Sequence, residues 1–281
     1  MILLALLLLQ AAPLQELSVQ GAKAMREGRF QEAERIYRDM IRQAPTEPRL
    51  RLNLALALHS GRKYAEAIPE FERFLRAMPA PGPAHLMLGL SRLKMKQFCE
   101  AIPPLEKARL WQANAQNLTE LADANAGCRR FAAAARAYRD AARLDPNNPA
   151  LPRAAARAFW QAREYVEARP LFAALEPKFR EDAQFLYEYG DTLARLEGVE
   201  MGLPLLEKAV ARQPDLLPAR GELGRNLVEA GRALEGIPHL EAAAPIDATL
   251  LLPLSRAYKA AGRVQDAARV EAEYRRSVAQ N

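Results

Sequence analysis

The 281-residue sequence has few of the residues that build catalytic or metal sites. It contains three histidines and two cysteines, too few for a disulfide framework or a cysteine-based zinc site. It has no HExxH pair for zinc, no GxSxG turn for a nucleophilic serine and no glycine-rich phosphate loop. The histidines stand singly, at His59, His85 and His239. We therefore expect no enzyme, no cofactor and no metal.

The sequence also lacks blocks of one charge. Lysine and arginine number 40 against 34 aspartates and glutamates, which gives a net charge of +6 and a pI near 9.4. Acidic residues interrupt every basic run, and aromatic residues make up only 7% of the chain. Contact with acidic partners is permitted, but a nucleic-acid binder would need a basic stripe and more stacking aromatics.

One apolar run stands apart, the sequence MILLALLLLQAA at residues 1–12. It is shorter than the ~20 residues of a membrane-spanning helix, and its small-residue end is typical of a secretory signal. No lysine or arginine precedes it, and Pro13 follows it, so an apolar first helix that caps the fold is the alternative. We expect a signal peptide at residues 1–12, no transmembrane span in the mature chain, and an exported (periplasmic or secreted) protein; without a signal it would be cytoplasmic.

A repeat of about 34 residues runs through the rest of the chain. Its clearest mark is a series of small residues: Ala33, Ala67, Ala101, Ala134, Ala168, Gly202, Gly236 and Ala267. A second small residue precedes each of these by twelve positions: Gly21, Ala55, Gly89, Ala122, Ala156, Gly190, Gly224 and Ser255. A large apolar residue lies one helical turn after the first series, from Tyr37 to Leu240. Each unit therefore contains two helices, and small residues are needed where their backbones approach.

Glycine and proline mark the turns and the helix ends of these units. Glycine lies between the two helices in REGRF, HSGRKY, EAGRA and AAGRV, where it can adopt the conformation of a tight turn. Proline ends several units, most clearly in LDPNNP at residues 144–149. Five further prolines stand two residues after the small position: Pro69, Pro103, Pro170, Pro204 and Pro238. We expect them near the beginnings of second helices, where few intrahelical hydrogen bonds are lost.

The 34-residue period, the two small positions and the terminal proline resemble the tetratricopeptide repeat (TPR) family. The resemblance covers residues 14–281, although the family's early tryptophan is missing from every unit. It implies an all-α fold, a right-handed superhelical α-solenoid of about eight stacked helix-turn-helix repeats. The domain plan is a signal peptide at 1–12 and an array over 13–281, with units near 14–47, 48–81, 82–114, 115–148, 149–182, 183–216, 217–247 and 248–281.

The resemblance also implies which first-helix positions line a concave groove. In the second and third units these positions predict an apolar stripe of Leu52, Leu56, Leu86, Leu90 and Leu93, suited to an apolar peptide or an amphipathic helix. In the fifth to eighth units they predict a basic and aromatic surface of Arg153, Arg157, Trp160, Tyr187, Asp191, Arg195, Arg225, Arg256 and Lys259. Guanidinium groups bind carboxylates in a bidentate manner, so this surface suits acidic segments.

The repeat register places the two cysteines at one edge of the stack. Cys99 opens a second helix and Cys128 ends the next first helix. A disulfide is conceivable if the protein is exported, although both positions usually point partly outward. The bond would require Cα atoms within about 7 Å.

The resulting hypothesis is a non-enzymatic scaffold of the cell envelope that binds peptide or helical segments of partner proteins in its groove. The alternatives are a nucleic-acid-binding helical-repeat protein and the regulatory subunit of an enzyme complex. An enclosed polar pocket, in place of an open groove, would favour an enzyme.

Overall fold

The computed structural model describes residues 2–79 and 82–279, with side chains from Leu14 onward. Within them the chain is all-α, with sixteen α-helices and one 3-10 helix. The helices are α1 (Ile2–Arg26), α2 (Phe30–Gln43), α3 (Pro48–Ser60), α4 (Tyr64–Ala77), α5 (Gly82–Lys94), α6 (Phe98–Trp111), α7 (Ala115–Gly127), α8 (Phe131–Leu144), α9 (Ala150–Gln161), α10 (Tyr165–Phe179), α11 (Ala183–Glu197), α12 (Val199–Arg212), α13 (Leu217–Glu229), α14 (Ala233–Ala243), η1 (Ala248–Leu250), α15 (Leu251–Ala260) and α16 (Val264–Ala279).

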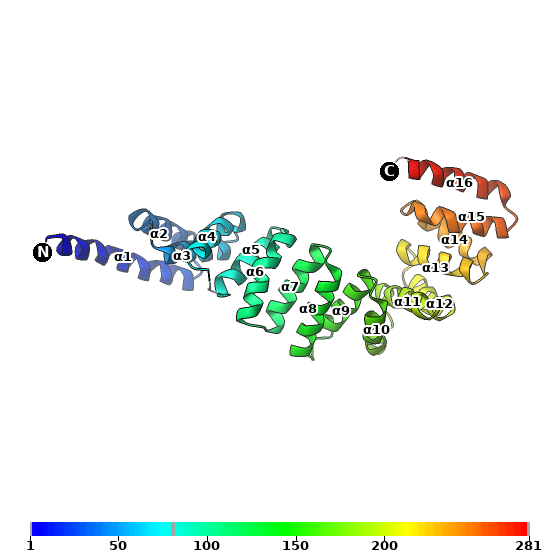
Figure 1. Cartoon of the computed structure of the whole chain (residues 1–281), viewed down its shortest axis with the longest axis horizontal. Coiled ribbons are helices and arrows are strands. Elements are labelled where there is room, and N and C mark those ends of the chain that lie inside the picture. The colour runs from blue at the N-terminus through cyan, green and yellow to red at the C-terminus, as the bar shows by residue number, and fades with distance from the viewer. Residues whose placement is uncertain (1, 80–81, 280–281) are drawn as a thin grey trace. The chain divides into compact units, whose positions relative to one another are not determined.

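The helices form eight pairs, and within each pair the two helices pack side by side (Figure 1). The chain divides into two compact units, Met1–Asn148 and Pro149–Asn281. The division falls in the LDPNNP segment, which is the clearest signal in the sequence for the end of a helix. Inside each unit, consecutive pairs also contact one another, so each pair buries an apolar face that it could not bury alone.

Small residues line the contact between the two helices of a pair. In the pair α11–α12 a Cβ atom added to Gly202 would lie 2.4 Å from the backbone oxygen of Gly190 and 2.6 Å from the Cβ of Ala194. In the pair α5–α6 a Cβ on Gly89 would lie 2.5 Å from Leu105. The two small positions of the repeat are thus the points where the helices approach most closely.

The turn inside a pair does not always depend on glycine. Gly28 has φ +71°, as expected, but Gly61 has φ −77° and the left-handed position passes to Arg62 at φ 60°. Lys63 N–H then donates to the carbonyl of Leu58 at 2.8 Å, which closes the helix end. The expectation that Gly61 supplies the turn conformation is wrong because the left-handed residue stands one position later.

The recurrent prolines lie deeper in the second helices than expected. Pro69, Pro103, Pro170, Pro204 and Pro238 are each the sixth residue of their helix. A sixth residue would donate to the carbonyl four positions earlier, so each proline removes one intrahelical hydrogen bond. That carbonyl belongs to an exposed residue in all five helices, and water can therefore hydrate it. The loss is tolerable for this reason, and not because the prolines lie at helix beginnings.

The N-terminal run expected to be a signal is helical where the structure describes it. Residues 2–12 form the first part of α1, which continues without interruption to Arg26, while Met1 lies outside the described residues. Among the described helices, we find none with both the length and the apolarity needed to cross a membrane.

Candidate functional site

The five leucines of the predicted apolar stripe are not freely exposed. All five are half-buried, on α3 and α5. Leu52 and Leu56 pack against the core that contains Tyr37 and Phe71. Leu86 and Leu93 pack against a second core cluster. The periodicity identified the correct helices, and these four side chains also contribute to the packing of neighbouring pairs; the role of the stripe in binding a peptide stays a prediction.

In the unit Pro149–Asn281 the predicted basic residues lie on first helices. Arg153 of α9 pairs with Asp182 at 3.0 Å. Its guanidinium carbon lies 4.8 Å from the centre of the Phe179 ring and 5.3 Å from that of Phe185. These contacts are those of a packing residue, because cation–π stacking on two rings holds the guanidinium inside the helix array.

Arg157 reaches from α9 to a buried carboxylate on α11. Its Nε lies 3.1 Å from Oε1 of Glu188, whose side chain is 0% exposed. Gln184 donates to the same oxygen at 2.8 Å. Burial raises the pKa of the Glu188 carboxyl despite these partners. The arginine is therefore engaged in stabilising a charge that the helix packing buries.

A continuous chain of hydrogen bonds connects α9, α11 and α13. Trp160 Nε1 donates to Asp191 Oδ2 at 2.6 Å, and Arg195 Nε donates to Asp191 Oδ1 at 3.0 Å. Arg195 also donates to Glu222 at 3.0 Å, and Arg225 to Glu222 at 2.9 Å. Together with the neighbouring Arg157–Glu188 pair we call this set the polar ladder: Arg157, Glu188, Trp160, Asp191, Arg195, Glu222 and Arg225. Its charges of opposite sign alternate, so their fields largely cancel.

Tyr187 adds an aromatic ring to the polar ladder. It packs edge-on against Trp160, with ring centres 5.5 Å apart. Burial raises the pKa of its phenol, and the nearby Asp191 carboxylate adds to the shift. Burial likewise raises the pKa of Glu222, together with the negative charge of Asp191. Two amphipathic rings, Trp160 and Tyr187, are thus held in fixed positions beside the ladder.

The last two predicted residues, Arg256 and Lys259, lie on α15. Lys259 pairs with Glu271 of α16 at 2.5 Å, and Ser255 donates to the same carboxylate at 2.6 Å. Arg256 is exposed. The structure therefore places Lys259 in the contact between the two helices of the final pair.

A pocket of about 220 Å³ opens beside the polar ladder. Its wall is formed by α11, α13 and the segment that leads into η1. The residues that line it include Tyr187, Glu222, Arg225, Ile246, Asp247 and Leu250. Ile246 is 60% exposed, although a large apolar side chain would gain by burial. The pocket thus combines an apolar rim with ladder groups that can hydrogen-bond.

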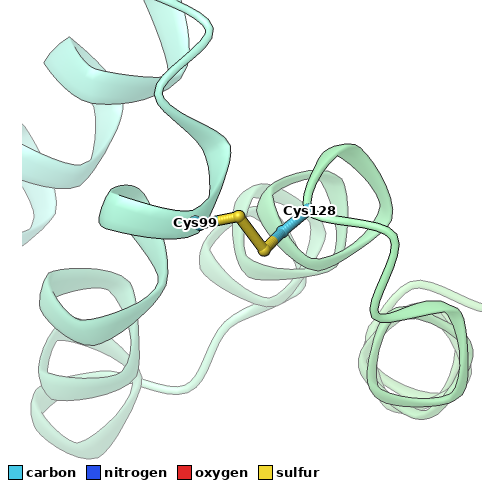
Figure 2. The surroundings of a disulfide bond; sticks show 2 residues. All are labelled: Cys99 and Cys128. Atoms are coloured by element: carbon cyan, nitrogen blue, oxygen red, sulfur yellow. A yellow bond between two sulfur atoms is a disulfide. The ribbon is translucent and has the colours of Figure 1, made fainter.

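The structure joins the two cysteines in a disulfide (Figure 2). The Cα atoms of Cys99 and Cys128 lie 5.0 Å apart, within the usual range for such a bond. Cys99 is the second residue of α6, and Cys128 follows the last residue of α7. The bond therefore connects two consecutive helix pairs at the edge of the stack where the repeat register placed both residues.

Two of the acidic partners, Glu188 and Glu222, were not predicted from the sequence, whereas Asp191 was. Glu188 stands 31 residues after Arg157, and Asp191 stands 31 residues after Trp160. An equal sequence separation is expected for residues that face each other on the first helices of successive units. Glu222 in turn stands 31 residues after Asp191, so the same separation extends to α13, but spacing alone does not show which of these side chains form hydrogen bonds. In the part of the chain that the structure describes, no group of three or more metal-ligating residues is positioned to hold a metal ion.

Comparisons with known proteins agree with this architecture. The tetratricopeptide repeat profile matches residues 20–83, 119–183 and 153–216, more than half of the chain. The chain therefore belongs to the tetratricopeptide repeat family, whose members are generally scaffolds that bind proteins or peptides and are typically non-catalytic. Among curated proteins, none matches the sequence.

Several solved structures share the fold. YrrB, described as a TPR protein with an unusual peptide-binding site, is 22% identical with a TM-score of 0.54, over 65% of this chain and 95% of its own. MamA from MSR-1 is 22% identical with a TM-score of 0.51, over 57% and 93%. MamA from AMB-1 is 23% identical with a TM-score of 0.51, over 56% and 94%. At such identities the likeness extends to the fold alone.

Proposed function

We propose that the unit Pro149–Asn281 binds an extended segment of a partner polypeptide along the first helices α9, α11 and α13. The observation that carries this proposal is the pocket beside the polar ladder. It places the exposed Ile246 next to the hydrogen-bonding groups of Glu222 and Arg225. An apolar anchor residue with polar groups around it is the usual composition of a recognition site.

The charges favour a particular kind of segment. Arg153, Arg157, Arg225 and Lys259 each pair with a carboxylate of the chain itself. An acidic partner would have to displace these internal carboxylates, two of which, Glu188 and Glu222, are largely desolvated. The site is therefore better suited to a segment of low net charge, with one apolar side chain for the pocket and backbone amides for the ladder. The same pairing leaves little basic surface for nucleic acid along these helices.

A photocrosslinking experiment tests the proposal. A benzophenone amino acid placed at position 246 in the native host should form adducts with a small set of proteins. A second probe at position 264 serves as the matched control, because Val264 is also apolar and 67% exposed but lies outside the pocket. Mass spectrometry then identifies the crosslinked segments.

Two further variants decide the outcome. Arg225→Gln removes a ladder group from the pocket, and Arg269→Gln is its control at an exposed arginine of α16. The position-246 adducts should decrease with Arg225→Gln and persist with Arg269→Gln. Identical adducts at positions 246 and 264, unaffected by Arg225→Gln, would contradict the proposal, and crosslinks to oligonucleotides would favour the alternative of nucleic-acid binding.

We also propose that the protein is exported. Two features support this: the apolar run at residues 1–12 and the disulfide between Cys99 and Cys128, since such bonds persist mainly in oxidising compartments. N-terminal sequencing of the protein from its host should find a mature chain that begins after residue 12. Retention of Met1 together with two free thiols would refute export.

A further inference from the structure

A second pocket, in the unit Met1–Asn148, lies between α4, α5 and α6. Its volume is about 290 Å³. Leu75, Leu88, Pro103 and Pro104 supply apolar walls. An engineered cavity of about 150 Å³ accommodates benzene, so this pocket has room for an aliphatic or aromatic side chain and the groups attached to it. We call it the α4–α6 pocket.

The α4–α6 pocket is separate from the first-helix groove. On α5 the pocket is lined by His85, Leu88 and Arg92, which are three and four residues apart and share a face. The predicted groove residues Leu86, Leu90 and Leu93 follow a different phase of the same helix. Because successive residues rotate by about 100° around a helix, the pocket and the groove use different sides of α5.

One arginine of this pocket is fully engaged. Arg92 Nη2 donates to Glu72 Oε1 at 2.6 Å, and its Nη1 donates to the backbone oxygen of Glu100 at 2.7 Å. Residue 104 would normally donate its N–H to the Glu100 carbonyl, but Pro104 has none. Arg92 therefore replaces the missing helix donor, and the Glu72 carboxylate is neutralised by the same side chain.

Two further cations line the pocket and are exposed, Arg76 of α4 and Lys107 of α6. Within residues 14–79 and 82–279, whose side chains the structure describes, neither forms a salt bridge. With Glu72 neutralised by Arg92, the pocket carries an uncompensated positive charge beside its apolar walls. This combination is complementary to an apolar group that ends in a carboxylate.

We propose that the α4–α6 pocket binds the C-terminal residue of a partner polypeptide. An apolar C-terminal side chain contacts Leu75, Leu88 and the proline rings, and the α-carboxylate pairs with Arg76 and Lys107. The pocket is open to solvent, which leaves room for the chain that precedes a C-terminal residue, and members of the family generally bind proteins or peptides; the proposed occupant is therefore a polypeptide end and not a free small acid. This site is independent of the polar ladder.

Fluorescence anisotropy with labelled hexapeptides tests the proposal on the full-length protein. The probe is a glycine-serine peptide that ends in leucine with a free carboxylate. Its C-terminal amide should bind roughly tenfold more weakly, since it loses charge-assisted hydrogen bonds. Lys107→Gln and Arg76→Gln should each weaken the acid and leave the amide unchanged. The control is Lys208→Gln, because Lys208 follows Gly202 by the same six residues that separate Lys107 from Ala101.

Each outcome decides the question. Equal affinity for acid and amide, or an effect of Lys208→Gln as large as that of Lys107→Gln, overturns the proposal. Binding of N-acetylleucine as tight as that of the peptide overturns the choice of a polypeptide end. Circular dichroism confirms that the variants are folded, and persistence of the position-246 crosslinks in Lys107→Gln separates this site from the one proposed above.

Discussion

Removal of the disulfide offers a quantitative test of how the unit Met1–Asn148 is held together. Cys99 and Cys128 are 29 residues apart in sequence. In the chain-entropy model, closing a loop of this size stabilises the folded state by about 3.5 kcal/mol, because it restricts the unfolded chain. The apolar cluster of α5–α7 is formed by alanine, leucine and isoleucine side chains, with Cys128 packed against it, so we expect most of it to remain packed without the bond. The replacement Cys99→Ser with Cys128→Ser should therefore weaken the unit without dismantling it.

The assay is urea unfolding followed by circular dichroism, with hydrogen exchange to locate the change. Reduction of the natural protein should lower the free energy of unfolding by about 3.5 kcal/mol, a substantial part of the roughly 5 to 15 kcal/mol typical of a domain. The double serine variant should show the same loss and no further response to reductant. Exchange should accelerate in α6 and α7, which the bond connects.

Helices remote from the bond provide the internal control. A solenoid is stabilised mainly by contacts between neighbouring repeats, so exchange in α15 and α16 should change little. An unchanged urea midpoint after reduction would refute the entropic reasoning. Equal loss of protection in α6 and α16 would show that the chain unfolds as one cooperative unit, contrary to nearest-neighbour behaviour.

Three further predictions concern urea midpoints. Gly202→Ala places a Cβ atom 2.4 Å from the backbone oxygen of Gly190, so overpacking should lower the free energy of unfolding by about 1 to 3 kcal/mol. Gly221→Ala meets mainly the flexible end of a leucine side chain at 2.7 Å and should lower it less. Equal losses in the two variants would refute the close approach of the helices at Gly202. Arg62→Gly should stabilise by up to about 1 kcal/mol, since Arg62 has φ 60°; a loss of stability would contradict the assigned turn. Burial raises the folded-state pKa of Glu188 above its usual 4.5, so its protonation contributes stability that is fully present below pH 4.5 and lost as the pH rises through the raised pKa. Glu188→Gln should remove this dependence of the urea midpoint on pH. An unchanged pH dependence would show that the carboxyl is not buried.

The repeat was predictable from sequence because it depends on local spacing. Ala67 and Ala101 stand 34 residues apart, and the small size that makes them visible in the sequence is also what lets two helices approach. The turn conformation was harder, since Gly61 and Arg62 are adjacent and either can end α3. Which of the two adopts the left-handed conformation depends on the hydrogen bond that ends the helix, in this case from Lys63 N–H to the carbonyl of Leu58. The conformational preference of a single residue does not determine it.

The candidate site was predicted only in part. The register placed Arg157, Trp160 and Arg225 on first helices, where the structure also has them. It could not show that Glu188 and Glu222 lie beside them, because that depends on the lateral distance and rotation between neighbouring helices. The same uncertainty affected the leucines, since half-buried and exposed positions differ by a small rotation of the helix.

The pairing of arginine with carboxylate changes how the net charge of +6 bears on recognition. Along α9, α11 and α13 every arginine of the polar ladder contacts a carboxylate of the chain, so this surface attracts no ligand by charge alone and must discriminate by shape and hydrogen bonding. At the α4–α6 pocket, Arg76 and Lys107 keep their charge available, and the attraction of an anion there should weaken with added salt. Binding at the polar ladder should therefore be nearly independent of salt, whereas binding at the α4–α6 pocket should not. One salt titration of each probe would distinguish these two modes of recognition, and equal salt dependence at both surfaces would show that the arginines of the ladder are not neutralised in solution.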